Sequence, residues 1–363
     1  MQRWIAIWTV PIFFIGSHCA ILFAAFTRAM LHSTAYGHWE PVCFNLLIEL
    51  ALLLLLLHGL RKAGGKDYAD LFLPLGKWIG AALILPLAAF MMLIPILALR
   101  FFAELLIIVF IASSPLHMIL GLLCLLMLFG ASIGPQGMLR ASTLLTLINF
   151  PVLLFAVFAC FQNAKFVRVF PLLNSSMDFF DGGKIFVTLF SICPILLLGM
   201  LPPICKVRIA PLLISLGVIG MLYVIIVYIP IAVYGLNAAK LMNFPLMTSF
   251  DSVNISWTIF NRISLFYAVA LLSFILTISN FSLWSSALMI HKLIPAWRET
   301  YIRICLCLVV FLISFFIPSW DEYVRVFSAD TWFRLAIYAV IPAAVFFRGR
   351  YIAGLARKRV LSE

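Results

Sequence analysis

The sequence predicts an all-α polytopic membrane protein with ten transmembrane helices, and two observations carry this prediction. Of the 363 residues, 65% are hydrophobic and only 10% are charged, which is unlike any soluble globular domain. The apolar residues also form long runs, and the basic residues stand at the ends of those runs. Because the basic residues form no long arm, the net charge of +12 indicates orientation in a lipid bilayer and not nucleic-acid binding.

Ten apolar runs, separated by polar breaks, define the predicted spans. A helix needs about 20 residues to cross the hydrocarbon layer. The first run has this length and ends without a small-residue cleavage site, so we expect a span there and not a cleaved signal peptide. The predicted spans cover residues 4–26, 42–60, 77–111, 115–133, 139–160, 184–201, 209–234, 258–290, 300–318 and 331–348.

The lysines and arginines favour one orientation of these spans. With ten spans both termini lie on one side, and a cytoplasmic placement puts 16 of the 25 basic residues inside, seven outside and two within spans. The excess of positive charge on cytoplasmic loops is a general rule of membrane proteins. We therefore expect cytoplasmic termini, a cytoplasmic tail at 349–363, and an external position for the acidic loop at 319–330.

Corresponding spans in the two halves of the chain predict an inverted repeat. The starts of the long spans 77–111 and 258–290 are separated by nearly the same offset as the interruptions at Gly16 and Cys193. Similar offsets predict a five-plus-five repeat within a single transmembrane domain, 1–363. Coincidence among ten similar apolar runs is the alternative. The repeats would cover about 4–160 and 184–348.

A proline inside the sixth span predicts a broken helix. Pro194 removes one backbone donor and its ring displaces a carbonyl near position 190. In a membrane such a break is tolerated where protein or a wet cavity covers it, and the exposed helix ends attract carboxylate and amine groups. With the matching interruption in the first span, this predicts a ligand site formed by Gly16, Ser17, His18, Cys19, Ser191, Cys193 and Pro194.

Several stretches occur in an order that is typical of one known family. They read GKDYADLFLPLGKWIG (65–80), LRFFAELL (99–106), FPLLNSSMDFFDGGKIFVTLFS (170–191), LLLGMLPPICK (196–206), and NFPLMTSF (243–250) followed by FNRISLFYAVALL (260–272). Together they resemble the B subunit of endospore germinant receptors, a spore germination permease family of the amino acid/polyamine/organocation superfamily. The resemblance covers most of residues 1–318. In the sixth span, Cys193 and Ile195 stand where that family often has a Gly-x-Glu pattern.

This resemblance carries further expectations. It implies a leucine-transporter-like fold with interrupted helices 1 and 6, and a place in the spore inner membrane. It also implies sensing of a small germinant, often an amino acid, together with an A subunit and a lipoprotein C subunit as partners. The runner-up function is secondary transport of an amino acid or a cation.

Polar residues inside the spans are the remaining candidates. Glu49 lies deep in the second span, where a charge costs at least about 2.5 kcal/mol. It is either a ligand or proton site or the member of a structural interhelical hydrogen bond, for which Asn45 is one candidate partner. His18 is either a ligand contact or an ordinary core histidine. Thr277 lines a cavity or packs between helices. For Arg100 and Glu104, which share one helix face, we expect a local ion pair.

No residues are assigned to catalysis, to a metal or to a cofactor. The carboxylates form no pair suited to acid–base chemistry, and the sequence has neither a P-loop nor a dinucleotide fingerprint. The eight cysteines lie in or beside apolar runs, so we expect no disulfides. We therefore do not expect an enzyme.

Overall fold

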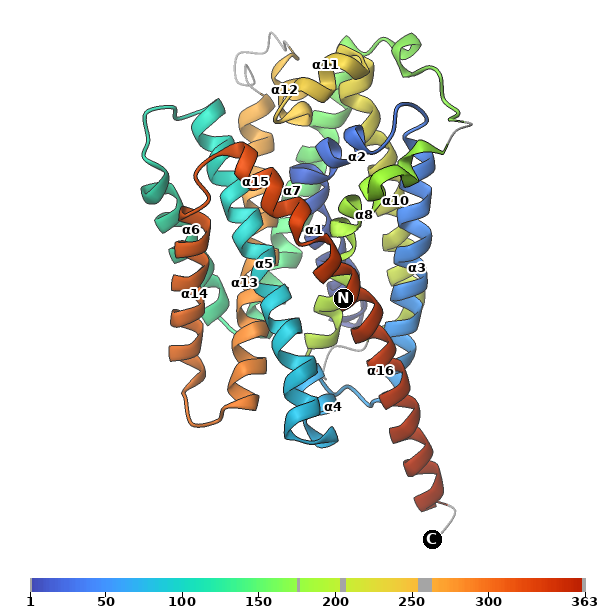
Figure 1. Ribbon diagram of the computed structural model, residues 1–363, viewed down its shortest axis with the longest axis vertical. Helices are drawn as coiled ribbons and strands as arrows, with labels where there is room; N and C mark the ends of the chain where they lie inside the picture. Colours follow the sequence, from blue (N-terminus) through green and yellow to red (C-terminus); the bar gives the residue numbers. More distant parts are fainter. Residues whose placement is uncertain (1, 175–176, 203–206, 254–262, 361–363) are drawn as a thin grey trace.

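The computed structural model describes residues 2–174, 177–202, 207–253 and 263–360, and within these ranges the protein is a bundle of helices (Figure 1). The long helices run roughly parallel to one axis, while shorter helices cover the two ends. In chain order the helices are α1 (Gln2–Ile21), α2 (Thr27–Ser33), α3 (Trp39–Lys62), α4 (Tyr68–Phe72), α5 (Lys77–Val109), α6 (Leu116–Ser132), α7 (Pro135–Cys160), α8 (Lys184–Thr188), α9 (Pro194–Leu197), α10 (Ile209–Tyr234), α11 (Leu236–Leu241), α12 (Pro245–Asp251), α13 (Ile263–Leu293), α14 (Glu299–Phe315), α15 (Trp320–Ala329) and α16 (Thr331–Val360).

Eight helical segments of the described chain are long and apolar enough to cross a membrane. The two long predicted spans are confirmed as helices, since α5 has 33 residues and the described part of the eighth span, α13, has 31. Helices α6 and α14, with 17 residues each, occupy two further predicted spans. The count of ten spans stays a prediction, and residues 258–262 lie outside the described ranges.

The two ends of the bundle carry different short helices. Helices α2, α11, α12 and α15 lie at one end, at the top of Figure 1, and this end is called the α15 end. Helix α4 lies at the opposite end, called the α4 end, and α16 extends beyond the bundle there (Figure 1). The α15 helix occupies the loop that the sequence predicts between the last two spans, and its first turn holds two acidic residues.

Close packing of backbones holds the long helices together. Helix α13 contacts α5, α7, α6 and α1, and α16 runs along α3. Glycine permits the second contact, because a Cβ atom on Gly349 would lie 2.3 Å from the carbonyl oxygen of Gly59. Small residues at such crossings let helices approach without side chains between them, which is a common basis of helix association in membranes.

The predicted interruption of the first span at Gly16–Cys19 is wrong. Helix α1 continues through these residues to Ile21, and the irregular segment is a π-helical turn at Leu22–Phe26. The small residues serve packing instead, since a Cβ atom on Gly16 would lie 2.3 Å from the Thr146 hydroxyl oxygen of α7. Glycine therefore allows a close helix crossing here and leaves the helix intact.

The predicted break in the sixth span is confirmed. Helix α8 ends at Thr188, a 3₁₀ turn covers Leu189–Ile192, and α9 begins at Pro194. A second 3₁₀ turn at Leu198–Met200 ends the segment. Proline suits the first position of a helix because its missing N–H has no intrahelical partner there. The span thus crosses the bundle interior as short turns, which leaves backbone carbonyls without regular helical partners.

Candidate functional site

Two buried side chains cap carbonyls of the broken segment, one from each end of the bundle. The Tyr68 hydroxyl of α4 donates to the carbonyl of Leu196 at 2.8 Å, and Nη1 of Arg334 of α16 donates to the carbonyl of Val187 at 2.8 Å. Neither Tyr68 nor Arg334 has any exposed surface. Backbone groups in an apolar interior need such partners, so the two contacts, called the Tyr68 cap and the Arg334 cap, stabilise the break.

The Tyr68 cap is built into the α4 end. Gly199 leaves room for the tyrosine ring, because a Cβ atom there would lie 2.1 Å from Cζ of Tyr68. Lys292 of α13 pairs with both Asp67 and Asp70, which flank Tyr68 in the sequence. Asp67 also accepts from the backbone N–H of Asp70 and so caps the short helix. Helix α4 is therefore fixed against the broken segment.

The Arg334 cap is equally well held. Its guanidinium pairs with Asp330 and donates to the carbonyl of Phe327 at 3.0 Å, both one to two turns earlier. It also lies over the rings of Phe190 and Phe327, at 4.9 and 5.3 Å from their centroids. A buried charge of this kind needs a counterion and donated hydrogen bonds, and Arg334 has both. The same residue thus neutralises Asp330 and anchors α8.

A buried histidine–carboxylate pair lies on the helices that contact the broken segment. Nε2 of His18 on α1 is 2.7 Å from Oε1 of Glu49 on α3, and both side chains are fully buried. The Tyr223 hydroxyl of α10 donates to Oε2 of Glu49 at 3.3 Å. Nδ1 of His18 lies 2.8 Å from the carbonyl of Phe14, which only accepts, so Nδ1 carries a proton. The structure therefore places two ionisable side chains, one from α1 and one from α3, in direct contact inside the bundle.

Asn45 has a different partner from the one that the sequence suggests. Its Nδ2 donates to the Thr188 hydroxyl at the end of α8, at 2.8 Å, and does not bond Glu49. Asn45 is therefore not the partner of Glu49, and the interhelical hydrogen bond of Glu49 comes from Tyr223. Asn45 instead ties α3 to the broken segment, one turn along the helix from Glu49.

Several buried polar atoms around the break have no hydrogen-bond partner within the described residues. They are Oγ of Ser17, Oδ1 of Asn45 and Oγ of Ser191. Nε2 of His18 and Oε1 of Glu49 are close enough for an ion pair, but their geometry is not that of a hydrogen bond. The Ser191 hydroxyl lies near that of Tyr223 but likewise without hydrogen-bond geometry. A buried polar group without a partner costs about 1–3 kcal/mol. These atoms are thus the ones suited to contact a small polar ligand.

The structure brings some predicted site residues together and separates others. Helices α1 and α3, which carry Ser17, His18 and Glu49, both contact the segment that carries Ser191, Cys193 and Pro194. Thr277 lies elsewhere: its hydroxyl donates to the carbonyl of Ser273, and it lines a separate cavity of about 320 Å³ between α6, α7 and α13. Gly16 faces Thr146, and Cys19 is fully buried on α1.

Three residues of the site are absent from the sequence prediction. Tyr68 belongs to a polar loop, Tyr223 to a featureless apolar helix, and Arg334 to the group of basic residues assigned to the outside. An arginine within an apolar run, in TWFRLAIYAV, is the one signal that favours a buried role. The expected Arg100–Glu104 pair is confirmed, and Arg100 also donates to the carbonyl of Ile317 at 3.2 Å.

Membrane-length helices around a broken span, with caps on its free carbonyls, define a multi-pass, permease-like membrane protein. Comparison with known families gives the particular group. Residues 6–322 match the model of the spore permease family, described as spore germination protein, and the chain belongs to this family. No curated protein matches the chain. The protein is thus a multi-pass membrane protein of spore germination.

Proposed function

We propose that the chain is the integral membrane subunit of a spore germinant receptor, which binds a small germinant beside the broken sixth span and signals germination. The observation that carries this proposal is the group of buried polar atoms without partners among the described residues, on Ser17, Asn45 and Ser191, next to a break that is capped from both ends. The receptor would lie in the spore inner membrane and act with an A subunit and a lipoprotein C subunit.

The chemistry of the site favours a zwitterion with an apolar side chain. The serine hydroxyls donate to a carboxylate, and the Asn45 carbonyl oxygen and Glu49 accept from an ammonium group. The remaining surroundings are apolar, since Ile192, Ile195 and Leu197 are buried on the same segment. An amino acid with an aliphatic side chain meets all these conditions.

Binding would act on a conformational equilibrium. A ligand shifts a protein between two states only by binding one of them more tightly. The orphaned polar atoms provide such a difference, because they gain partners when the ligand is present. If α8 or α9 moves to close on the ligand, the Arg334 cap or the Tyr68 cap must change as well, because each cap bonds a carbonyl of one of these helices. Partner subunits in contact with the caps' helices would respond to that change.

The proposed architecture has ten spans in two inverted halves, with both termini in the cytoplasm. Helices α5 and α13 support it, as matched long helices in the third and eighth positions that pack against each other. In this orientation the α4 end faces the cytoplasm and the α15 end faces outward.

A reporter that works only in the cytoplasm, fused after Glu363, is expected to be active. The reason is the excess of basic residues in the loops that this orientation places inside. The measurement is reporter activity in membranes that contain the full-length fusion, with a fusion after Lys165 as the control that should be inactive. An inactive but well-expressed Glu363 fusion would reject the ten-span topology.

Ser191→Ala is expected to raise the germinant concentration for half-maximal response of spores by about tenfold, which corresponds to about 1.4 kcal/mol. The variant removes a hydroxyl that has no partner among the described residues of the unliganded protein, so folding should change little. Ser314→Ala is the matched control, a buried serine that donates to the carbonyl of Ile96, far from the break in sequence. Wild-type sensitivity of Ser191→Ala and also of Ser17→Ala would place the germinant elsewhere.

One observation favours a second candidate, a proton-coupled transporter of an amino acid or a cation. The His18–Glu49 pair places two ionisable groups in contact, both fully buried, beside the site. Intramembrane carboxylates and histidines of this kind form proton relays in transporters. Uptake of a labelled amino acid into vesicles, driven by a proton gradient and lost in Glu49→Gln, would establish this function. Adjacent genes for an A subunit and a lipoprotein would instead support the receptor.

A further inference from the structure

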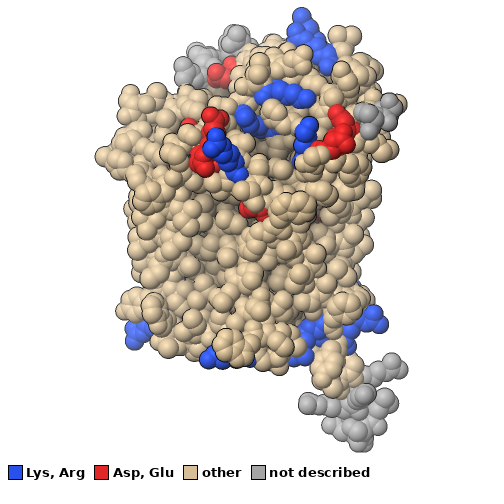
Figure 2. All heavy atoms as spheres, viewed as in Figure 1, with Lys and Arg blue, Asp and Glu red and all other residues tan. Residues whose placement is uncertain are grey.

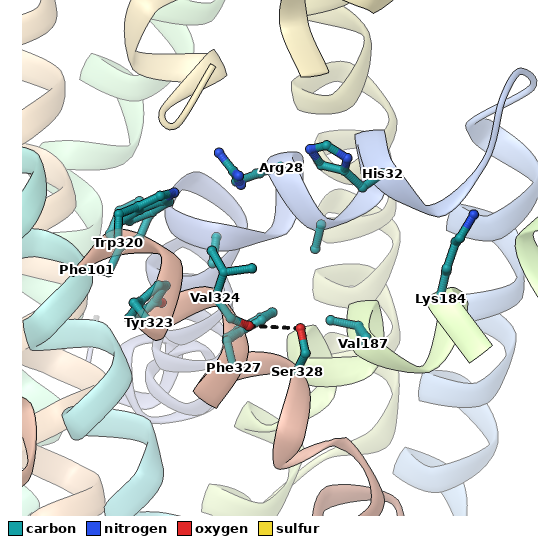
Figure 3. Close-up of a pocket in the computed structure, with 12 residues that line it drawn as sticks. Arg28, His32, Phe101, Lys184, Val187, Trp320, Tyr323, Val324, Phe327 and Ser328 are labelled. Atoms are coloured by element: carbon teal, nitrogen blue, oxygen red, sulfur yellow. Dashed lines mark hydrogen bonds between the residues drawn. The ribbon is translucent and has the colours of Figure 1, made fainter. Parts of the chain in front are cut away.

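A cavity of about 430 Å³ at the α15 end is called the vestibule (Figure 3). It lies beside the Arg334 cap, and Ser17, Asn45 and Ser191 are not among its lining residues. Helices α2, α5, α8 and α15 and the π-helical turn enclose it. Its size is typical of sites for small molecules. The residues that define it are Ala25, Arg28, Ala29, His32, Phe101, Lys184, Val187, Trp320, Tyr323, Val324, Phe327 and Ser328.

The described residues that line the vestibule include basic side chains and no carboxylate. Arg28 and His32 lie along one border and Lys184 along another (Figure 3). Lys184 forms no ion pair with any described residue, and the hydrogen bonds of Arg28 within the described chain go to neutral acceptors on Met242 and Asn243. Figure 2 shows this end of the molecule from outside, where basic and acidic side chains both gather on the surface.

Acidic groups near the vestibule do not cancel this charge. Asp178 already accepts from the Thr34 hydroxyl and the backbone N–H of Ala35, and Asp321 attracts Arg28 without forming an ion pair with it. Next to the vestibule, burial lowers the pKa of Lys240; Asp178 opposes this effect and Lys184 adds to it. The described lining of the cavity therefore carries Arg28 and Lys184 without a carboxylate, in a partly enclosed space where charge attraction is weakly screened.

The opposite side of the vestibule is aromatic. Trp320, Tyr323 and Phe101 stand together across the cavity from Lys184 (Figure 3). Trp320 and Tyr323 are stacked with centroids 5.1 Å apart, and Arg28 lies over the Trp320 ring at 5.4 Å. Rigid aromatic surfaces bind apolar groups with little loss of conformational freedom. A ligand that spans the cavity would therefore meet Lys184 at one end and, at the other, aromatic rings with Arg28 beside them.

We propose that the vestibule binds an organic carboxylate with an aromatic or apolar body, with its carboxylate toward Lys184 and His32 and its body against Trp320 and Tyr323. This site does not depend on the germinant function proposed above. Val187 and Phe327 form one side of the cavity, and both contact Arg334 behind them. The Arg334 cap thus separates a carboxylate in the vestibule from the polar atoms of the broken span.

The test is equilibrium binding of labelled 3-phenylpropionate to the purified full-length protein in detergent. We expect saturable binding to the wild-type protein. Unlabelled 3-phenylpropionamide, which lacks the carboxylate, and acetate, which lacks the aromatic body, should displace the label at least about tenfold more weakly than unlabelled 3-phenylpropionate does. Lys184→Gln should weaken binding by about tenfold, whereas Lys184→Arg, which keeps the charge, should restore it. Equal displacement by acid and amide would overturn the proposal.

Two control variants locate the ligand. Lys165→Gln removes an exposed lysine that does not line the vestibule and should leave binding unchanged. Ser191→Ala changes the broken span and should also leave it unchanged. If Ser191→Ala weakens binding as much as Lys184→Gln does, the ligand occupies the broken span and the vestibule proposal is wrong. Thermal unfolding of each variant shows that the protein remains folded, and wild-type affinity in a folded Lys184→Gln variant also rejects the proposal.

Discussion

Glu49→Leu is expected to destabilise the folded protein by about 3–5 kcal/mol, because one member of a fully buried pair is removed. The leucine leaves Nε2 of His18 without its carboxylate and the Tyr223 hydroxyl without its acceptor. Glu49→Gln keeps a polar side chain of the same size, so we expect a loss of about 1 kcal/mol, similar to one ordinary hydrogen bond. Thermal unfolding of the purified proteins in detergent measures the difference.

The control for this pair of variants is a carboxylate that lies at the surface. Glu322→Leu removes a 41% exposed side chain that pairs with the exposed Arg325. Exposed ion pairs contribute about 0–1 kcal/mol, so Glu322→Leu should unfold close to wild type. Equal unfolding temperatures for Glu49→Leu and Glu322→Leu would show that Glu49 is hydrated in the folded protein. With a folded Glu49→Gln variant, an altered response to germinant separates a role at the site from a purely structural one.

Arg334→Met is expected to cost about 3–5 kcal/mol and to loosen the α15 half of the broken span. The variant leaves the Asp330 carboxylate, which is 8% exposed, without its counterion. It also removes the donors to the carbonyls of Val187 and Phe327. Because α8 loses its anchor, the buried Cys193 thiol should react faster with a maleimide than in the wild-type protein. Both quantities are measurable on one purified sample.

A double variant distinguishes loss of the ion pair from loss of the cap. Asp330→Asn combined with Arg334→Met removes both charges, so it should be more stable than Arg334→Met alone. Labelling of Cys193 should nevertheless stay fast, because the Val187 carbonyl still lacks its donor. Arg325→Met, on the exposed face of α15, is the matched control with normal labelling. Slow labelling in both Arg334 variants would mean that Arg334 does not hold the broken span closed.

Hydropathy and proline chemistry predict the fold and one half of the site. A long apolar run has one stable conformation in a bilayer, and a proline has a direct effect on the backbone, so the break at Pro194 follows from the sequence. Gly16 is different, because glycine either loosens a helix or lets another helix approach. Thr146, on a helix that is remote in the sequence, decides between the two.

The partners of the buried polar residues depend on three-dimensional packing. Tyr223 and Glu49 are 174 residues apart, and Asn45 and Thr188 are 143 apart. Composition identifies Glu49 as a residue that needs a partner, but it does not say which of many hydroxyls and imidazoles reaches it. The same holds for the vestibule, whose basic and aromatic residues come from segments spread over most of the chain. Neither Arg28 nor Trp320 has a local sequence signal for this role.

Helix α16 connects the two ends of the broken span mechanically. Arg334 near its start holds the Val187 carbonyl, and Arg348, in its second half, donates to the carbonyl of Leu71 in α4 at 3.2 Å. Along a helix these two positions are about 21 Å apart. Pro342 lies between them, and because proline has no backbone N–H, it removes one hydrogen bond of the helix there. Because one helix bonds both places, a displacement of α16 that releases the Val187 carbonyl is expected to pull on the Leu71 carbonyl of α4 as well.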